Sequence, residues 1–160
     1  MRKPFIVFVG PGRCGKDECC RILESVSVLK NAGTTSKYLT KYVAQEMGVD
    51  EETCYRERHQ NRQRWREIGD QVRRDDPAKL VTEAMQHGDI TGGIRGLSEI
   101  VAVRYLVDLV VWVDRDVPPD ETLEFGKEHA DLVLPNHWSL DDLEIRLMRL
   151  AWSLGVYRPE

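Results

Sequence analysis

The stretch FIVFVGPGRCGKD, residues 5–17, joins an apolar run to a glycine-rich turn and the start of a helical pattern. Its last eight residues fit the pattern G-x-x-x-x-G-K-[ST] of a phosphate-binding loop at every position but the last. Glycines allow backbone N–H groups to converge on phosphate oxygens, and the following helix adds the positive end of its dipole. The alternative is a strand-to-helix turn with a solvated Lys16. The apolar strand before the loop and the helix after it favour phosphate binding, with Lys16 directed toward the β- and γ-phosphates.

The loop ends in Asp17, where the pattern has a Ser or Thr hydroxyl that helps to hold Mg²⁺. Mg²⁺ prefers oxygen ligands and keeps several of its waters, so a carboxylate can hold it directly or through water. Asp17 also lies in the first turn of the predicted helix, where a negative charge is stabilising. Without the metal this carboxylate would repel a triphosphate, so we expect an unusually metal-dependent site.

Length and composition predict one soluble domain. The chain has 160 residues, 41% of them hydrophobic, which suffices for one full core and not for two ordinary domains. A net charge of −4 gives no field for nucleic acid or an anionic membrane, and no stretch approaches the ~20 apolar residues of a membrane span. The first apolar run stops at Gly10, too short for a signal peptide. We expect free thiols in a reducing cytoplasm and no zinc site, because no C-x-x-C pair occurs among Cys14, Cys19, Cys20 and Cys54.

Five short apolar runs are predicted to be strands, at residues 5–9, 26–29, 89–94, 109–113 and 132–134. The first and fourth are continuous rather than alternating, as expected for parallel strands covered on both faces. Helical patterns lie between the runs and give the order β-α-β-α-α-β-α-β-α-β-α. This order predicts an α/β three-layer sandwich with a parallel sheet and right-handed crossovers. No linker or repeat interrupts residues 1–160, so we expect a single domain.

Two segments complete the C-terminal third. Residues 139–142, SLDD, are typical of a capping box at the start of the last helix. Its inward stripe is predicted to be Leu140, Leu143, Leu147, Leu150 and Leu154. Residues 114–130 include Val117-Pro118-Pro119-Asp120 and predict a mobile excursion with a short helix. Composition alone favours a surface connection without a role for this segment.

A long helix predicted over about residues 51–74 places arginines beside aromatic side chains. At about 100° per residue, one face holds Tyr55, Arg58, Arg62, Trp65, Gly69, Val72 and Arg73. Arginine stems that cover apolar surface would explain this face about as well as a site for a phosphate and a stacked base. The neighbouring phosphate loop favours the substrate site.

Two further segments follow predicted strands. Residues 34–37, TTSK, are sufficiently explained as the cap of a helix over residues 38–47, although their hydroxyls could also reach an acceptor. Arg95 comes just after the third strand, at the sheet edge where open α/β folds bind ligands. We favour a functional Arg95 over an ordinary surface arginine.

These motifs together resemble the bacteriophage deoxynucleoside monophosphate kinases, a branch of the P-loop nucleoside monophosphate kinase superfamily. GKD in place of GK[ST] is typical of those enzymes, and phosphomevalonate kinases of the same superfamily also use it. The other matching stretches cover most of the chain in order: WREIGD at 65–70, GIRG at 93–96 with Glu99 after it, VWVDR at 111–115 and ADLVLPN at 130–136. One departure is Glu18, where the usual GKDT has threonine.

The resemblance implies an adenylate-kinase-like fold with strand order 2-3-1-4-5, an acceptor-binding helical part at about residues 34–75 and a lid at about 114–130. ATP with Mg²⁺ would be the phosphoryl donor and a 2′-deoxynucleoside 5′-monophosphate (dNMP) the acceptor, in host cytoplasm during infection. The expected partners are small-molecule nucleotides, with no nucleic acid or membrane. Homodimerisation, the accepted base and the choice between deoxyribose and ribose stay open.

The resemblance and the helix face together assign the site residues. The expected catalytic residues are Lys16, Asp17, Arg95 on the acceptor phosphate and Arg115 in the lid, with Asp17 as the metal ligand. The expected ATP-binding residues are Gly10, Gly12, Arg13, Cys14, Gly15, Lys16, Asp17, Glu18, Arg115 and Asn136. The expected dNMP-binding residues are Thr35, Ser36, Lys37, Arg58, Arg62, Trp65, Arg66, Gly69, Asp70, Arg73, Arg95 and Glu99.

Two other functions stay open at this point. One is another small-molecule P-loop kinase, of the phosphomevalonate- or dephospho-CoA-kinase type. The other is a non-catalytic nucleotide-binding protein. The combination of Lys16, Arg95 and Arg115 favours catalysis, since a protein that only binds nucleotide needs no cation on the acceptor side.

Overall fold

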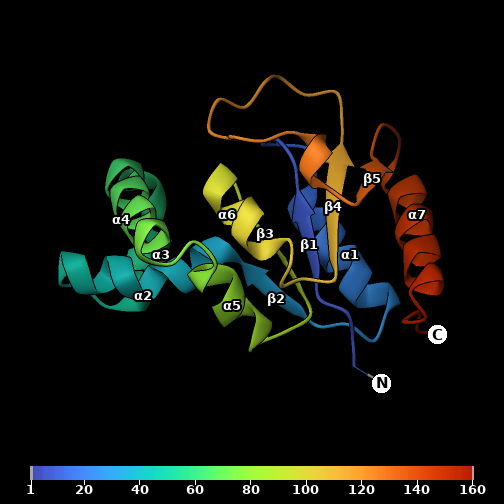
Figure 1. The fold of residues 1–160 in the computed structure, drawn as a ribbon, viewed down its shortest axis with the longest axis horizontal. Coiled ribbons are helices and arrows are strands. Elements are labelled where there is room, and N and C mark those ends of the chain that lie inside the picture. Colours follow the sequence, from blue (N-terminus) through green and yellow to red (C-terminus); the bar gives the residue numbers. More distant parts are fainter. Residues whose placement is uncertain (1, 160) are drawn as a thin grey trace.

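A five-stranded parallel sheet forms the centre of the molecule (Figure 1). The computed structural model describes residues 2–159. Its strands are β1 (Ile6–Val9), β2 (Asn31–Thr34), β3 (Ile90–Gly92), β4 (Leu109–Asp114) and β5 (Leu132–Pro135). They lie in the order β2-β3-β1-β4-β5. The α/β class, the parallel sheet and this strand order confirm the expectation from the sequence.

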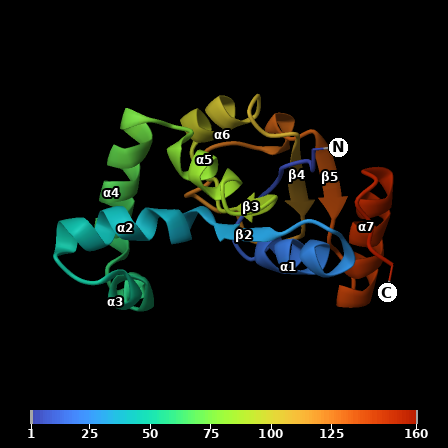
Figure 2. The same cartoon turned by 90° about the horizontal axis from the view of Figure 1, so that it is seen from below.

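The sheet separates two hydrophobic cores because the central strand β1 is buried on both faces. Ile6 and Phe8 pack with α1 (Lys16–Val26) and α7 (Leu140–Ser153) on one face. Val7 and Val9 pack on the other face with the core that includes α5 (Lys79–Met85) and α6 (Leu97–Val103). Figure 2 shows these two helical layers on opposite sides of the sheet. Burial on both faces explains why the run is continuously apolar.

Most of the helices between β2 and β3 extend beyond the β2 edge of the sheet (Figure 2). Those that extend are α2 (Thr35–Met47), α3 (Glu51–Arg56) and α4 (Arg62–Asp75), whereas α5 lies over the sheet. Thr34 is the N-cap of α2 by position, but its side chain makes no capping hydrogen bond. No helix within residues 2–159 is both long enough and apolar enough to cross a membrane.

The continuous helix expected over residues 51–74 is wrong. The chain leaves α3 at Glu57, forms a 3-10 turn over Arg58–Gln60 and resumes as α4 at Arg62. Between Cys54 and Trp65 no residue is buried. Helices in proteins are held mainly by packing of one face, and this stretch has no face to pack. The arginines expected on a single helix face are therefore split between the 3-10 turn and α4.

The strand expected at residues 26–29 is also wrong. Helix α1 continues to Val26, and Ser27 forms only an isolated bridge with Tyr157. Val26 and Leu29 are apolar because they pack into the core near α7. The second strand is NAGT at 31–34, whose Asn and Gly are depleted in strands generally. It forms because it pairs with β3, from Asn31 beside Ile90 to Thr34 beside Gly92.

Two details of the C-terminal third differ from expectation. Between β4 and β5 the predicted short helix is only a 3-10 turn, Lys127–His129. The start of α7 is confirmed, since Ser139 Oγ accepts a hydrogen bond from the Asp142 N–H at 3.2 Å. Its buried stripe begins at Leu143, whereas Leu140 is 61% exposed because it lies beyond the packed part of the helix.

Candidate active site

Four strands end at the same edge of the sheet and bring distant segments together there. The loop at residues 10–15 follows β1, Arg95 follows β3, Arg115 follows β4 and Asn136 follows β5. In open parallel sheets this carboxyl edge is where ligands bind. The structure therefore places most of the predicted donor-side residues, together with Arg95, at one edge.

The loop after β1 adopts backbone angles that depend on glycine. Gly10 and Gly15 have φ values of 147° and 99°. A Cβ at Gly10 would lie 2.9 Å from the carbonyl oxygen of Val113, so this position tolerates no side chain. Arg13, with φ of 68°, is the one non-glycine residue with positive φ within residues 2–159. Such a conformation costs about 1 kcal/mol or more and is held by its surroundings.

Asn136, which follows β5, holds the loop through a hydrogen bond. Its side chain is buried, and Nδ2 donates a hydrogen bond to the Cys14 carbonyl at 2.8 Å. A Cβ at Gly15 would lie 2.6 Å from the same Nδ2 atom, so glycine allows this close approach. Asn136 was expected to bind ATP, and in the structure it fixes the shape of the loop. Burial raises the pKa of the Cys14 thiol above its ordinary value, and the opposing effect of nearby Lys16 is smaller. This thiol is therefore neutral at neutral pH.

Lys16 is held by the carbonyl groups of its own loop. Its Nζ atom donates to Gly10 O at 2.8 Å and to Pro11 O at 2.9 Å, and lies 3.7 Å from the Cys14 sulfur. The side chain is buried, yet no carboxylate pairs with it within the described chain. A buried ammonium with only carbonyl partners is a cation available to an incoming anion.

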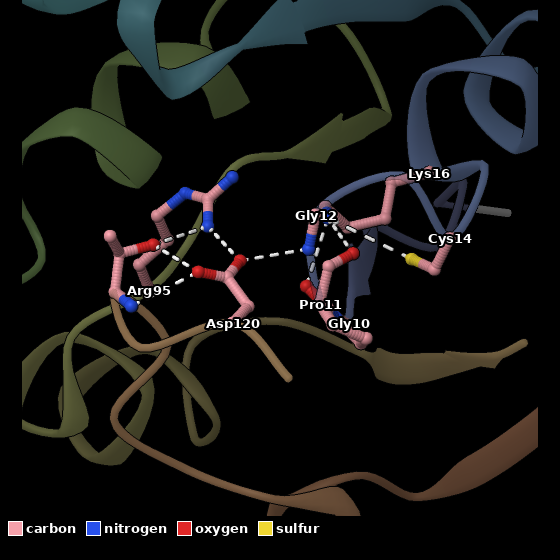
Figure 3. Close-up of polar contacts among 8 residues, drawn as sticks. Gly10, Pro11, Gly12, Cys14, Lys16, Arg95 and Asp120 are labelled. Atoms are coloured by element: carbon pink, nitrogen blue, oxygen red, sulfur yellow. Dashed lines mark hydrogen bonds and ion pairs between the residues drawn. The ribbon is translucent and has the colours of Figure 1, made fainter. Parts of the chain in front are cut away.

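Asp120 joins the loop to Arg95 (Figure 3). Its Oδ2 atom accepts a hydrogen bond from the Gly12 N–H at 2.8 Å and one from Arg95 Nη1 at 2.5 Å. Arg95 Nη1 also donates to Thr122 Oγ1 at 2.7 Å. Burial acts to raise the pKa of Asp120, but hydrogen bonds from Thr122, Gly12 and Arg95 hold it well below its usual range. The carboxylate is therefore ionised at neutral pH.

Sequence reasoning did not find the role of Asp120 as a partner of the loop. The contact joins residues 108 positions apart, which no local pattern encodes. The pair Pro118-Pro119 is the one available signal, since two prolines stiffen the chain just before the carboxylate.

The segment that carries Asp120 is anchored further along the chain. Glu124 accepts a hydrogen bond from the Leu97 N–H at 3.0 Å, and its own N–H donates to the Arg95 carbonyl at 2.9 Å. Phe125 is buried and meets Trp112 edge to face, with ring centroids 6.4 Å apart. Residues 115–123 thus form an arch between β4 and this anchor.

The remaining donor-side residues are exposed or partly exposed. The Asp17 side chain faces solvent at the start of α1, and Glu18 pairs with Arg21. Arg13 and Arg115 are exposed, and neither side chain makes an ion pair within residues 2–159. Within residues 2–159, no group of three or more His, Cys, Asp or Glu side chains is placed to hold a metal ion.

Glu99 is the most unusual group on the acceptor side. Its side chain is 0% exposed, and within residues 2–159 its only ion pair joins Oε2 to Arg73 Nε at 3.4 Å. Its Oε1 atom has no hydrogen-bond partner within the described residues. Desolvation raises the pKa of Glu99, against the opposing charge of Arg73. A buried oxygen without a donor carries a free-energy cost, and in native proteins it points to a water or ligand that supplies one.

Helix α4 contributes the other half of this cluster. A Cβ at Gly69 would lie 2.7 Å from Arg73 Nη1, so the missing side chain leaves room for the guanidinium. The Trp65 indole N–H, one turn earlier, is also buried and without a partner among residues 2–159. The predicted residues Trp65, Gly69, Arg73 and Glu99 are thus linked by α4 and by the Arg73–Glu99 ion pair.

Of the other predicted acceptor residues, Asp70 touches the cluster through an ion pair, its Oδ1 lying 4.0 Å from Arg73 Nη1. No ion pair joins Arg58, Arg62 or Lys37 to the cluster within the described residues. Arg58 stacks on the Tyr55 ring, 4.0 Å from its centroid, and Arg62 lies 3.4 Å from Nδ1 of His59. Thr35 is buried, close to where a side chain on Gly93 would be. The exposed members are Ser36, Lys37, Arg66 and Asp70.

The raised pKa of Glu99 predicts how stability depends on pH. The unfolded chain releases this proton near the ordinary pKa of 4.5, while the folded chain retains it to higher pH. The free energy of unfolding therefore falls as pH rises from 4.5 through the folded pKa, by about 1.4 kcal/mol per unit of difference. The Glu99→Gln variant does not have this loss. Its free energy of unfolding in urea, compared with that of the native chain at the same pH, should therefore increase from pH 4.5 to pH 7.

Glu67→Gln is the matched control for this measurement. Hydrogen bonds from Gln63 and Arg64 lower the pKa of this exposed carboxyl, so its contribution to stability is lost as pH falls. As pH rises, the stability of the Glu67→Gln control relative to the native chain should therefore change only slightly, and in the opposite direction to that of Glu99→Gln. A stability difference for Glu99→Gln that is flat with pH contradicts the raised pKa.

Comparison with known proteins adds no family to this description. A scan of the chain against protein-family models gave no match, and a search of the curated proteins gave none. The functional assignment therefore depends on the contacts described above.

Proposed function

We propose that this chain is a P-loop kinase that transfers the γ-phosphoryl group of ATP to a 2′-deoxynucleoside 5′-monophosphate. The observation that carries the proposal is the meeting of Gly12 N–H and Arg95 on a single carboxylate oxygen. A backbone donor from the loop and a cation from the next strand thus converge on one anion. The strand order 2-3-1-4-5 supports an adenylate-kinase-like P-loop fold.

On the donor side the loop and Lys16 would bind the β- and γ-phosphates. Lys16 Nζ would exchange the Gly10 and Pro11 carbonyls for phosphate oxygens, a rotation of one flexible side chain. Asp17, exposed at the start of α1, would hold a Mg²⁺ ion directly or through water. That ion would neutralise charge that develops on the transferred group. Arg115, at the start of the segment 114–130, would close over the donor as part of a lid.

On the acceptor side Arg95 would bind the monophosphate so that its oxygen attacks the γ-phosphorus in line. The bond from phosphorus to the bridging oxygen breaks, and ADP leaves with that electron pair. The acceptor part at residues 34–75 would hold the nucleoside near Arg73 and Glu99. The free Glu99 Oε1 and Trp65 N–H support a ligand that offers both a donor and an acceptor, as a nucleobase edge does.

This cluster favours a nucleotide acceptor over phosphomevalonate. Phosphomevalonate has no aromatic ring to lie beside Trp65 and no N–H group for Glu99. The convergence of Gly12 and Arg95 favours phosphoryl transfer over simple nucleotide binding, since the second cation serves the group that receives the phosphoryl.

The first prediction from this proposal concerns Lys16. Lys16→Ala should lower kcat by about 10²-fold or more, because removal of a charge that stabilises the transition state has this effect. The measurement is ADP release in the presence of ATP, Mg²⁺ and a panel of dNMPs, NMPs, phosphomevalonate and dephospho-CoA. Lys30→Ala, at an exposed position, is the control. An unchanged kcat in the Lys16 variant would remove the phosphate loop from the mechanism.

The second prediction concerns the metal. Asp17→Asn should raise the Mg²⁺ concentration that gives half the maximal rate, because the variant loses a charged oxygen ligand. Asp141→Asn is a matched control, since Asp141 is also an exposed acidic residue in the first turn of a helix. Equal Mg²⁺ dependence in both variants would leave Asp17 as a partner of the helix dipole only.

The third prediction concerns the acceptor cluster. Arg73→Ala combined with Glu99→Gln, which avoids an unpaired buried carboxylate, should raise the KM for dNMP about 10-fold or more. The KM for ATP should hardly change. Arg74→Ala, the exposed neighbour on α4, should leave both values as they are.

Tryptophan fluorescence gives an independent readout of the same cluster. The emission should change on addition of dNMP and much less on addition of ATP, and Trp65→Phe should remove the dNMP response. A lowered melting temperature with no selective effect on dNMP would instead assign Arg73 and Glu99 to stability.

A further inference from the structure

The arch at residues 115–123 places an acidic side chain inside the candidate phosphate site. Figure 3 shows the Asp120 carboxylate between Gly12 of the loop and the guanidinium of Arg95. The side chain is only 14% exposed, whereas that of Arg95 is 42% exposed. Asp120 is therefore enclosed between two donors that belong to different strands.

The two donors that hold Asp120 are those that an anionic ligand would use. Gly12 contributes a backbone N–H from the loop, and Arg95 contributes a guanidinium that suits oxyanions. Under the proposed function, the carboxylate oxygen here would take the place of a phosphoryl oxygen. Lys16, the third donor expected for a phosphate, points to the carbonyls of Gly10 and Pro11 instead.

The carboxylate is held by its own segment as well. Thr122 donates to Asp120 Oδ1 through its backbone N–H at 3.0 Å and through its hydroxyl at 2.6 Å. The same hydroxyl oxygen accepts from Arg95 Nη1. These bonds orient Oδ2 toward Gly12 and Arg95, so the contact is built into the turn at residues 120–122.

We propose that Asp120 is an internal competitor of the phosphoryl group, which must leave before phosphate can contact both Gly12 and Arg95. The inference rests on the proposed function, because it takes the loop to be a phosphate site. The anchor at Glu124 and Phe125 lies outside the arch, so Asp120 can withdraw while the end of the arch stays attached.

Internal competition lowers apparent affinity by a fixed factor. A ligand binds only the fraction of molecules in which the site is open, so its apparent Kd rises by the inverse of that fraction. The factor applies to every ligand that needs Gly12 and Arg95. ATP makes further contacts and so starts from a lower Kd. The same factor can therefore leave ATP bound at a concentration where a weaker ligand such as pyrophosphate is unbound. Asp120 would in this way keep the site from filling with small inorganic anions.

The test compares Asp120→Asn and Asp120→Ala with Asp116→Asn. Asp116 lies four residues earlier in the same arch and is exposed, so its variant makes the same charge change without touching the site. Isothermal titration with Mg²⁺ and either pyrophosphate, ADP or ATP measures Kd for each protein. We expect both Asp120 variants to bind pyrophosphate, ADP and ATP at least about 10-fold more tightly than the native chain. Asp116→Asn should match the native chain.

Other results separate this inference from the proposed function. Nucleotide binding by all four proteins, with equal or weaker affinity in the Asp120 variants, overturns the competition and leaves the kinase proposal standing. No nucleotide binding by any of the four folded proteins overturns the phosphate site and the competition with it. Circular dichroism of each variant establishes that it is folded.

Discussion

The register of β1 with its two neighbours fixes the whole candidate site. Phe8 lies beside Gly92 of β3, and Val9 lies beside Trp112 of β4. All three strands run the same way, so the loop after β1, Arg95 and the arch that follows β4 start from one level of the sheet. A shift of one residue in either pairing would turn the strand's side chains to the opposite face and separate Arg95 from Gly12. The convergence on Asp120 thus depends on backbone pairing in the core.

The interior of this protein combines apolar packing with buried polar atoms. β1 is buried on both faces by apolar residues, and the Trp65 ring packs in the same core as Val7 and Val9. Within the described residues, however, Trp65 Nε1 and Glu99 Oε1 are buried polar atoms that lack partners. Each such atom costs about 1–3 kcal/mol when no hydrogen bond replaces water. A fold tolerates this cost more readily where a ligand later supplies the missing partner. Under the proposed function, β1 would hold the fold while the unpartnered atoms of Trp65 and Glu99 would meet the ligand.

The sequence predicted those features that are encoded locally. The strand, loop and helix at residues 5–26 follow one another directly, and the strand order came with the resemblance. The second strand could not be found from NAGT, whose formation depends on pairing with β3. The break between α3 and α4 could not be predicted from the helical periodicity of residues 51–74. Periodicity does not show that the residues between Cys54 and Trp65 have nothing to pack against. Asp120 was missed because its partners Gly12 and Arg95 lie far away along the chain.

The central place of β1 also has a consequence for how the chain folds. Ile6 pairs with Ile90 on one side and with Leu109 on the other, so the first strand is completed only by residues from the second half of the chain. Contacts of such long sequence separation form slowly, because much of the chain must be ordered before they are made. During synthesis the apolar run at residues 5–9 cannot pair with either neighbour until residues 90–109 have emerged. We therefore expect the glycine-rich loop to acquire its shape only after β3 and β4 have paired with β1.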